Sequence, residues 1–186
     1  MRELDDAAIR TEVTRVLRGL IRIDTSNPPG NETPAATFLK SYLEDSGLEC
    51  ELVAREPRRA NLVARIRGSG GGPSLTLMGH TDVVPADPRD WTHPPFEAHL
   101  DEEGFVGGRG TVDMKNETAT RAVTMALLAR SDWRPRGDLV FIAQADEETA
   151  NTRWGSSGSG TNAPTFAVTI RSTREAACGM SLPTDA

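Results

Sequence analysis

The sequence has 186 residues, a length that fits one ordinary domain. Its 27 acidic and 21 basic residues give a net charge of −6, which argues against a nucleic-acid-binding surface. No apolar run approaches membrane-spanning length, and the N-terminal segment MRELDDAAIR lacks the basic and apolar regions of a signal peptide. Cys50 and Cys178 form neither a metal-ligand cluster nor a disulfide framework, so we expect a soluble protein of the cytoplasm.

Helices and strands alternate along the first 150 residues. Apolar residues at helical spacing predict three helices, over 7–22, 33–46 and 114–130. Short apolar runs predict four strands, over 50–54, 61–68, 74–79 and 138–145. Proline, glycine and asparagine indicate loops over 24–32 and 81–112. Because several strands are almost continuously apolar, the sequence predicts an α/β three-layer sandwich, with a mostly parallel central sheet and helices on both faces.

Polar clusters follow two of the predicted strands. The strand over 74–79 leads into His80 and Asp82, and the strand over 138–145 leads into Asp146-Glu147-Glu148. Functional groups of open α/β sheets gather beyond the carboxyl ends of strands. In extended backbone, residues two apart face the same side, so the Asp82 carboxylate can orient the His80 ring toward a metal. The alternative is a histidine–acid pair with a structural role only.

Adjacent carboxylates can take different tasks. Glu147 and Glu148 leave an extended backbone in opposite directions, so one can bind a metal while the other accepts a proton from water. Asp113, at the start of the third predicted helix, adds another carboxylate. Taken singly, these acids are as typical of a solvated loop or a helix start. Together with His80 they suit a site for two divalent ions.

The motifs occur in an order that resembles a known family. LMGHTDVVPAD, GFVGGRGTVDMK and VFIAQADEE resemble the zinc hydrolases that include acetylornithine deacetylase, succinyl-diaminopimelate desuccinylase and the aminoacylases. The resemblance spans residues 1–150, and it implies the N-terminal part of a catalytic domain. It implies hydrolysis of a peptide or N-acyl amino acid with two zinc ions, for which cobalt or manganese can substitute. It also implies a smaller lid domain that often mediates dimerisation.

The resemblance assigns a role to each candidate residue. It implies that His80 binds one zinc ion, Glu148 binds the second, and Asp113 bridges both. It further implies that Glu147 is the general base and that Asp82 orients His80. The family also uses a second acid and a distant C-terminal histidine as ligands, for which this sequence offers no candidate. We therefore expect a truncated domain without the lid, with an incomplete metal site and little or no activity.

Residues 151–186 depart from the family pattern. They are rich in Ser, Thr, Gly and Asn, and by composition alone they resemble a flexible linker. Read two bases later with permissible codons, residues 151–179 encode YEMGLEWLGNERPDLRRDYSLNEGGGMR, which looks like the family's own continuation after DEE. We therefore expect a frameshifted, poorly ordered tail. The alternative to a hydrolase fragment is a non-catalytic remnant that interacts with a full-length relative.

Overall fold

The structure is a computed structural model, and it describes residues 5–149. This part of the chain contains three α-helices, α1 (Asp6–Ile21), α2 (Thr33–Glu44) and α3 (Lys115–Ala129). Their ends lie within two residues of the predicted ends. At the start of α1, the Asp5 carboxylate accepts a hydrogen bond from the Ala7 N–H, and this cap stabilises the first turn.

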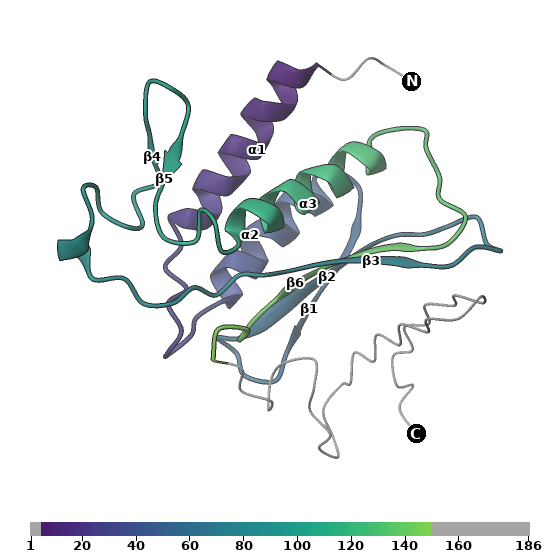
Figure 1. The fold of residues 1–186 in the computed structure, drawn as a ribbon. Coiled ribbons are helices and arrows are strands. Elements are labelled where there is room, and N and C mark those ends of the chain that lie inside the picture. The colour runs from purple at the N-terminus through teal and green to yellow at the C-terminus, as the bar shows by residue number, and fades with distance from the viewer. Residues whose placement is uncertain (1–4, 150–186) are drawn as a thin grey trace.

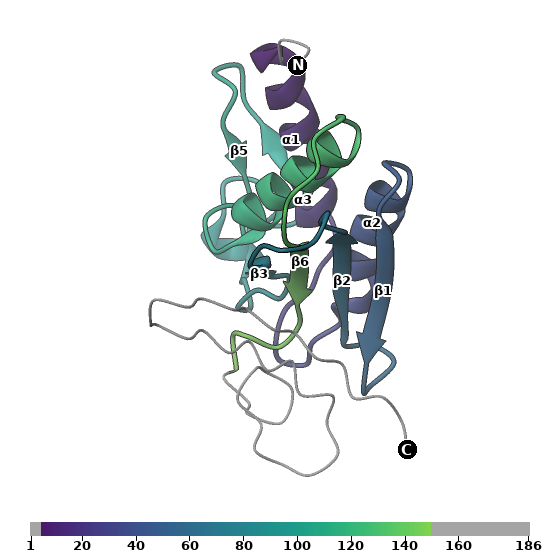
Figure 2. The same ribbon diagram turned by 90° about the vertical axis from the view of Figure 1, so that its right-hand side faces the viewer.

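Four strands form the central sheet in the order β1-β2-β6-β3 (Figure 2). They are β1 (Glu49–Ala54), β2 (Ala60–Ile66), β3 (Leu75–His80) and β6 (Leu139–Gln144). The strands β3 and β6 run parallel, in a register that pairs His80 with Gln144. Both strands therefore end at the same edge of the sheet, and the polar residues that follow them meet there.

The α/β class is confirmed, but the prediction of a mostly parallel sheet is wrong for the described strands. Only the β3–β6 pair is parallel among them, whereas β1–β2 and β2–β6 are antiparallel. The loop over 55–59 is too short for a crossover connection, so β1 and β2 form an antiparallel pair. The apolar run in β6 reflects burial on both faces, which does not depend on strand direction.

The hydrophobic core lies between the sheet and the helices. In the described residues all three helices lie on one face of the sheet, not on both as predicted (Figure 1). The helix α2 packs on β1 and β2, α3 packs on β3 and β6, and α1 packs mainly on α3. Alternate residues of β2 are buried against this layer, namely Ala60, Leu62, Ala64 and Ile66. The helices therefore pack against the strands that lead to this edge of the sheet.

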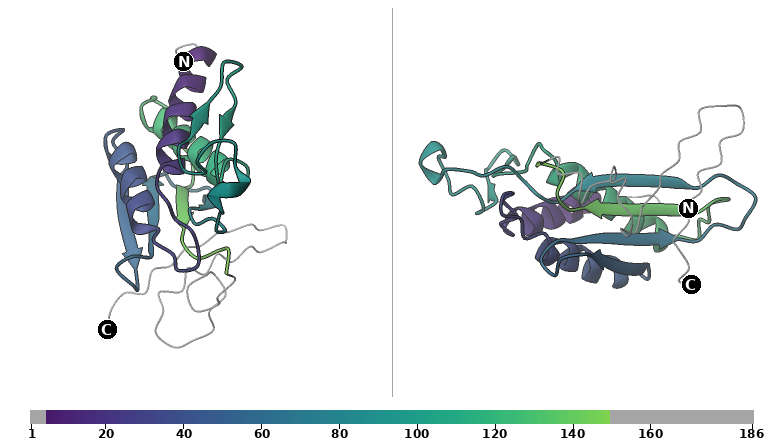
Figure 3. Two further views of the ribbon diagram at one scale, coloured as in Figure 1. Left: turned by 90° about the vertical axis from the view of Figure 1, so that its left-hand side faces the viewer. Right: turned by 90° about the horizontal axis from the view of Figure 1, so that it is seen from below.

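The segment between β3 and α3 is largely loop, as predicted. It contains a 3₁₀ turn, η1 (Pro88–Asp90), and a small hairpin of β4 (His99–Leu100) and β5 (Val106–Gly107). The hairpin lies beside α1 (Figure 3), where Arg18 Nε donates a hydrogen bond to the Ala98 carbonyl at 2.9 Å. Within residues 5–149, no helix has the length and apolar character needed to span a membrane. The expected frameshifted tail, 151–186, lies outside the described residues.

Candidate metal centre

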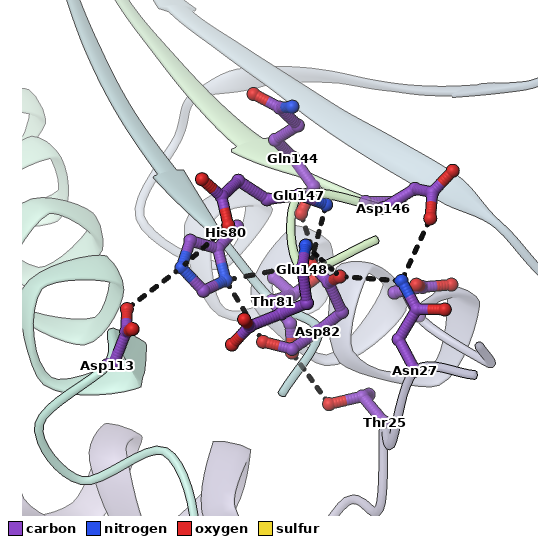
Figure 4. A network of polar contacts seen from close by, with 12 residues as sticks. Thr25, Asn27, His80, Thr81, Asp82, Asp113, Gln144, Asp146, Glu147 and Glu148 are labelled. Atoms are coloured by element: carbon purple, nitrogen blue, oxygen red, sulfur yellow. Dashed lines mark hydrogen bonds and ion pairs between the residues drawn. The ribbon is translucent and has the colours of Figure 1, made fainter. Parts of the chain in front are cut away.

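The ends of β3 and β6 and the start of α3 bring three potential metal ligands together. One ligand atom from each of His80, Asp113 and Glu148 lies within 4.8 Å of the other two. Of the residues the structure describes, these three form the single group of histidine, cysteine and acidic side chains with such spacing. Figure 4 shows that the candidate ligands come from separate segments, which the fold brings together.

The His80 ring is oriented by Asp82. His80 Nδ1 lies 3.0 Å from the Asp82 main-chain carbonyl oxygen and 3.6 Å from the carboxylate oxygen Oδ1. A carbonyl oxygen only accepts, so Nδ1 carries a hydrogen and Nε2 is left to face the other candidate ligands. Nε2 lies 3.1 Å from Asp113 Oδ1 and 3.8 Å from Glu147 Oε2.

Asp82 is fully buried, and its carboxylate is held by donors from three sides. Oδ1 accepts the Glu147 N–H at 3.2 Å, and Oδ2 accepts the Glu148 N–H at 3.0 Å and the Asn27 amide at 2.8 Å. Burial by itself raises the pKa of Asp82, but His80 and these hydrogen bonds outweigh it and lower the pKa to about 2. Asp82 is therefore a fixed anion at the base of the candidate site.

The charge of the surrounding acids changes the protonation of His80. Burial lowers the pKa of His80, but the hydrogen bonds and charge of Asp82, together with the charge of Glu147, raise the pKa to about 9. In the metal-free protein the ring is therefore protonated at neutral pH. A cation must displace this proton to bind Nε2, so metal binding at this site releases a proton.

Asp113 stands at the end of a tight loop that precedes α3. Gly110 takes a positive φ of 84° in this loop, where an added Cβ would lie 2.8 Å from a Val83 side-chain carbon. Lys115, two residues after Asp113, is fully buried. Its ammonium group donates to the Leu20 and Ile23 carbonyls at 3.0 and 2.9 Å. Burial lowers the pKa of Lys115 to about 8. This anchor fixes the loop, while the Asp113 side chain remains 76% exposed.

The two glutamates after β6 differ in their surroundings. The Glu147 side chain is 54% exposed, whereas Glu148 is half-buried. Burial raises the pKa of Glu148; the charge of His80 opposes this shift, and the charges of the neighbouring acids add to it. All five residues singled out by the sequence, His80, Asp82, Asp113, Glu147 and Glu148, thus lie around one site.

Residues that the sequence did not single out surround this site. Asn27 donates to both Asp82 and Asp146, and Arg59 forms ion pairs with Asp146 and with the fully buried Glu32. Asn27 and Glu32 belong to a segment that its proline and glycine content identified only as a loop. A buried pair of one acid and one arginine gives no local pattern, so these partners become visible only in the fold.

The donor set suits a divalent cation. One imidazole and two carboxylates are ligands that zinc accepts, and the open sides of Asp113 and Glu147 leave room for water or substrate. A buried aspartate behind the histidine is the arrangement that orients metal-binding imidazoles. The residues present therefore fit a metal ion of this kind.

The fold and the site define an α/β protein with a candidate metal centre at the carboxyl edge of its sheet. The model of peptidase family M20/M25/M40 matches residues 76–171, more than half of the chain. The chain belongs to this family, as the motifs indicated.

Relatives support the assignment. A probable succinyl-diaminopimelate desuccinylase of Staphylococcus epidermidis is 38% identical over 136 residues, which cover 73% of this chain and 32% of that protein. A succinyl-diaminopimelate desuccinylase of Hydrogenovibrio crunogenus is 33% identical and is matched over 74% of this chain and 35% of its own length. The chain thus spans about a third of the length of the curated relatives it matches.

Solved structures show the same fold. An M20 family metallo-carboxypeptidase from Sulfolobus solfataricus matches with a TM-score of 0.64 and 21% identity, over 74% of this chain and 31% of that one. Human carnosine dipeptidase 1 matches with a TM-score of 0.63 and 18% identity, over 78% and 34% of the two chains. At these identities the similarity concerns the fold alone.

Proposed function

We propose that this chain carries part of the active site of a zinc-dependent hydrolase that cleaves the amide bond of a peptide or an N-acyl amino acid. The observation that carries the proposal is the group of His80, Asp113 and Glu148, whose ligand atoms lie within 4.8 Å of one another beside Glu147. The name of a curated relative, a probable succinyl-diaminopimelate desuccinylase, is consistent with this chemistry.

Each residue takes a task that its position allows. His80 and Glu148 would each hold one ion, and Asp113, exposed between them, would bridge the two. The chemistry supplied by bound zinc is activation of a water molecule and polarisation of the amide carbonyl. Glu147 is an exposed acid beside the ligand group and not part of it, so its carboxylate would accept the proton of the attacking water and pass it to the leaving nitrogen. Asp82 would keep His80 in the correct tautomer.

The ligands available to each ion determine how tightly this chain binds metal. His80 and Asp113 would hold one zinc ion, and Asp113 and Glu148 the other, so the described residues supply two protein ligands for each. Catalytic zinc sites have three or more protein ligands. We therefore expect weak zinc binding and little turnover by this chain alone, with cobalt or manganese able to replace zinc.

The test measures zinc binding by titration in the wild-type chain and in two histidine variants. His80→Gln removes the proposed ligand, and His93→Gln removes an exposed histidine outside the cluster. We expect His80→Gln to weaken binding at least about tenfold and His93→Gln to leave it unchanged. Equal affinities in all three proteins would reject the proposed site. Ordinary turnover of N-acetyl or N-succinyl amino acids by the wild-type chain would reject the expected loss of activity.

A further inference from the structure

The Asn27 side chain lies between two buried carboxylates (Figure 4). Its amide nitrogen Nδ2 lies 2.8 Å from Asp82 Oδ2 and 2.8 Å from Asp146 Oδ1. All three residues are at most 3% exposed. An amide NH₂ has two hydrogens, so one asparagine donates to both carboxylates at once.

The main chain fixes Asn27 independently of these contacts. Ser26 forms a parallel bridge with Val83, and the Asn27 N–H donates to the Val83 carbonyl at 2.9 Å. The neighbouring Thr25 hydroxyl donates to the Thr81 carbonyl at 2.6 Å. The segment after α1 therefore lies along the residues that follow β3, and it carries the amide to its place.

The two carboxylates belong to different parts of the candidate metal centre. Asp82 orients His80, and it accepts the backbone N–H groups of both Glu147 and Glu148. Asp146 starts the turn that carries those glutamates, and it adopts a φ of +63°, which is rare for a residue with a Cβ. A conformation of this kind persists when surrounding contacts hold it.

Two further donors bind the same Asp146 oxygen as Asn27, whereas the buried Oδ2 has no partner among the described residues. Arg59 donates to Asp146 Oδ1 at 2.9 Å, and the Thr149 hydroxyl donates to the same oxygen at 2.6 Å. Arg59 also forms a bidentate pair with the buried Glu32. Its single positive charge is thus shared by two acids. The Asn27 amide adds one uncharged donor to Asp82 and one to Asp146.

We propose that Asn27 is a positioning residue of the candidate metal centre. Its amide links Asp82 to Asp146 and so sets the position of the Glu147–Glu148 turn relative to His80. The effect on metal binding rests on the proposed function, whereas the effect on the turn does not. Among the described residues, the hydrogen bonds of the Asn27 side chain go to Asp82 and Asp146 and not to the candidate ligands or Glu147, so it acts through the two aspartates.

The experiment compares two variants of the full chain with a matched control. Asn27→Ala removes both hydrogen bonds, and Asn27→Asp keeps the size but places a third carboxylate between the other two. Tyr42→Phe is the control, because it removes one part-buried hydrogen bond, to Glu12, that lies outside the site. Three quantities are measured: amide hydrogen exchange at Glu147 and Glu148 without metal, zinc affinity, and the visible spectrum of the cobalt-saturated protein.

In both Asn27 variants we expect the Glu147 and Glu148 amides to exchange at least about tenfold faster, zinc affinity to fall about 10- to 100-fold, and the cobalt spectrum to change. Asn27→Asp should show the larger effects, and Tyr42→Phe none of them. Unchanged exchange in Asn27→Ala would overturn the proposal. If the wild-type chain binds zinc, an unchanged zinc affinity in Asn27→Ala would also overturn it. If exchange is faster in the Asn27 variants but the wild-type chain binds no zinc, the link from Asp82 to Asp146 is supported and the proposed function is rejected.

Discussion

The candidate metal centre has two sides that differ in burial and in hydrogen bonding. On one side, His80 is 5% exposed and Asp82 is fully buried, and each has partners fixed by the fold. On the other side, the side chains of Asp113 and Glu147 are 76% and 54% exposed. We call these the buried side and the open side of the site.

The difference separates two requirements of a metal-dependent active site. Groups on the buried side can hold one orientation without substrate, because neighbouring donors restrict them. Groups on the open side must reach water and substrate, so they remain accessible. Substitutions on the buried side should therefore affect folding and metal binding together, whereas those on the open side should affect binding or chemistry alone.

The largest effect is expected from Asp82→Ala. The substitution removes the side-chain acceptor of the part-buried Glu147 and Glu148 N–H groups, and one of the two acceptors of the Asn27 amide. Removing one member of such a buried charged network costs about 3–5 kcal/mol of unfolding free energy. Urea unfolding followed by circular dichroism measures it. A loss below about 1 kcal/mol would show that the buried side is not the rigid part of the site.

Acid should weaken the buried side through the same residue. The pKa of Asp82 is about 2 in the folded chain, below its ordinary value of 3.8. The stabilisation is therefore complete above pH 3.8 and is lost as the pH falls through 2, by about 2 kcal/mol in total. The unfolding free energies of the wild type and of Asp82→Asn are measured at pH 5 and pH 2. The difference between the two proteins isolates the contribution of Asp82, because Glu12 and Asp138, whose pKa values are also lowered, are present in both. An equal loss in the two proteins would contradict the assignment to Asp82.

The three helices, the four strands of the central sheet and the five candidate site residues could be predicted from sequence, because their signals are local. Apolar spacing located α1, α2 and α3, and acids directly after a strand located Glu147 and Glu148. The directions of the strands could not be predicted, because burial of β6 makes it apolar whether its neighbours are parallel or antiparallel.

The supports of the buried side were not predictable for a different reason. Asn27 lies 55 residues from Asp82 and 119 from Asp146 in sequence. Arg59 lies 27 residues from Glu32 and 87 from Asp146. Neither Asn27 nor Arg59 has a sequence spacing that marks it as part of the site. The bridge between Ser26 and Val83 and the end of β6 determine which residues they contact. Such residues are found by following the hydrogen bonds of a predicted site residue one step further.

A substitution on the open side should separate binding from stability. Asp113→Asn keeps the size of the side chain but removes the charge that would bridge two ions, so zinc affinity should fall about 10- to 100-fold. Its side chain is 76% exposed, so the unfolding free energy of the metal-free chain should change by less than about 0.5 kcal/mol. Calorimetric zinc titration and urea unfolding measure the two quantities. A large loss of stability would place Asp113 with the buried side.

The smallest effect on stability is expected from Glu147→Gln. Only its backbone N–H contacts Asp82, and the substitution retains that hydrogen bond, so unfolding free energy should change by less than about 0.5 kcal/mol. The amide cannot accept a proton as a carboxylate does. Because Glu147 contributes none of the three ligand atoms, zinc affinity should change less than about threefold. Affinity is measured with Glu148→Gln as the matched control, since the neighbouring substitution removes a proposed ligand and should weaken binding. If Glu147→Gln weakened zinc binding as much as Glu148→Gln, Glu147 would be a ligand, and the division between a binding acid and a proton-accepting acid would be wrong.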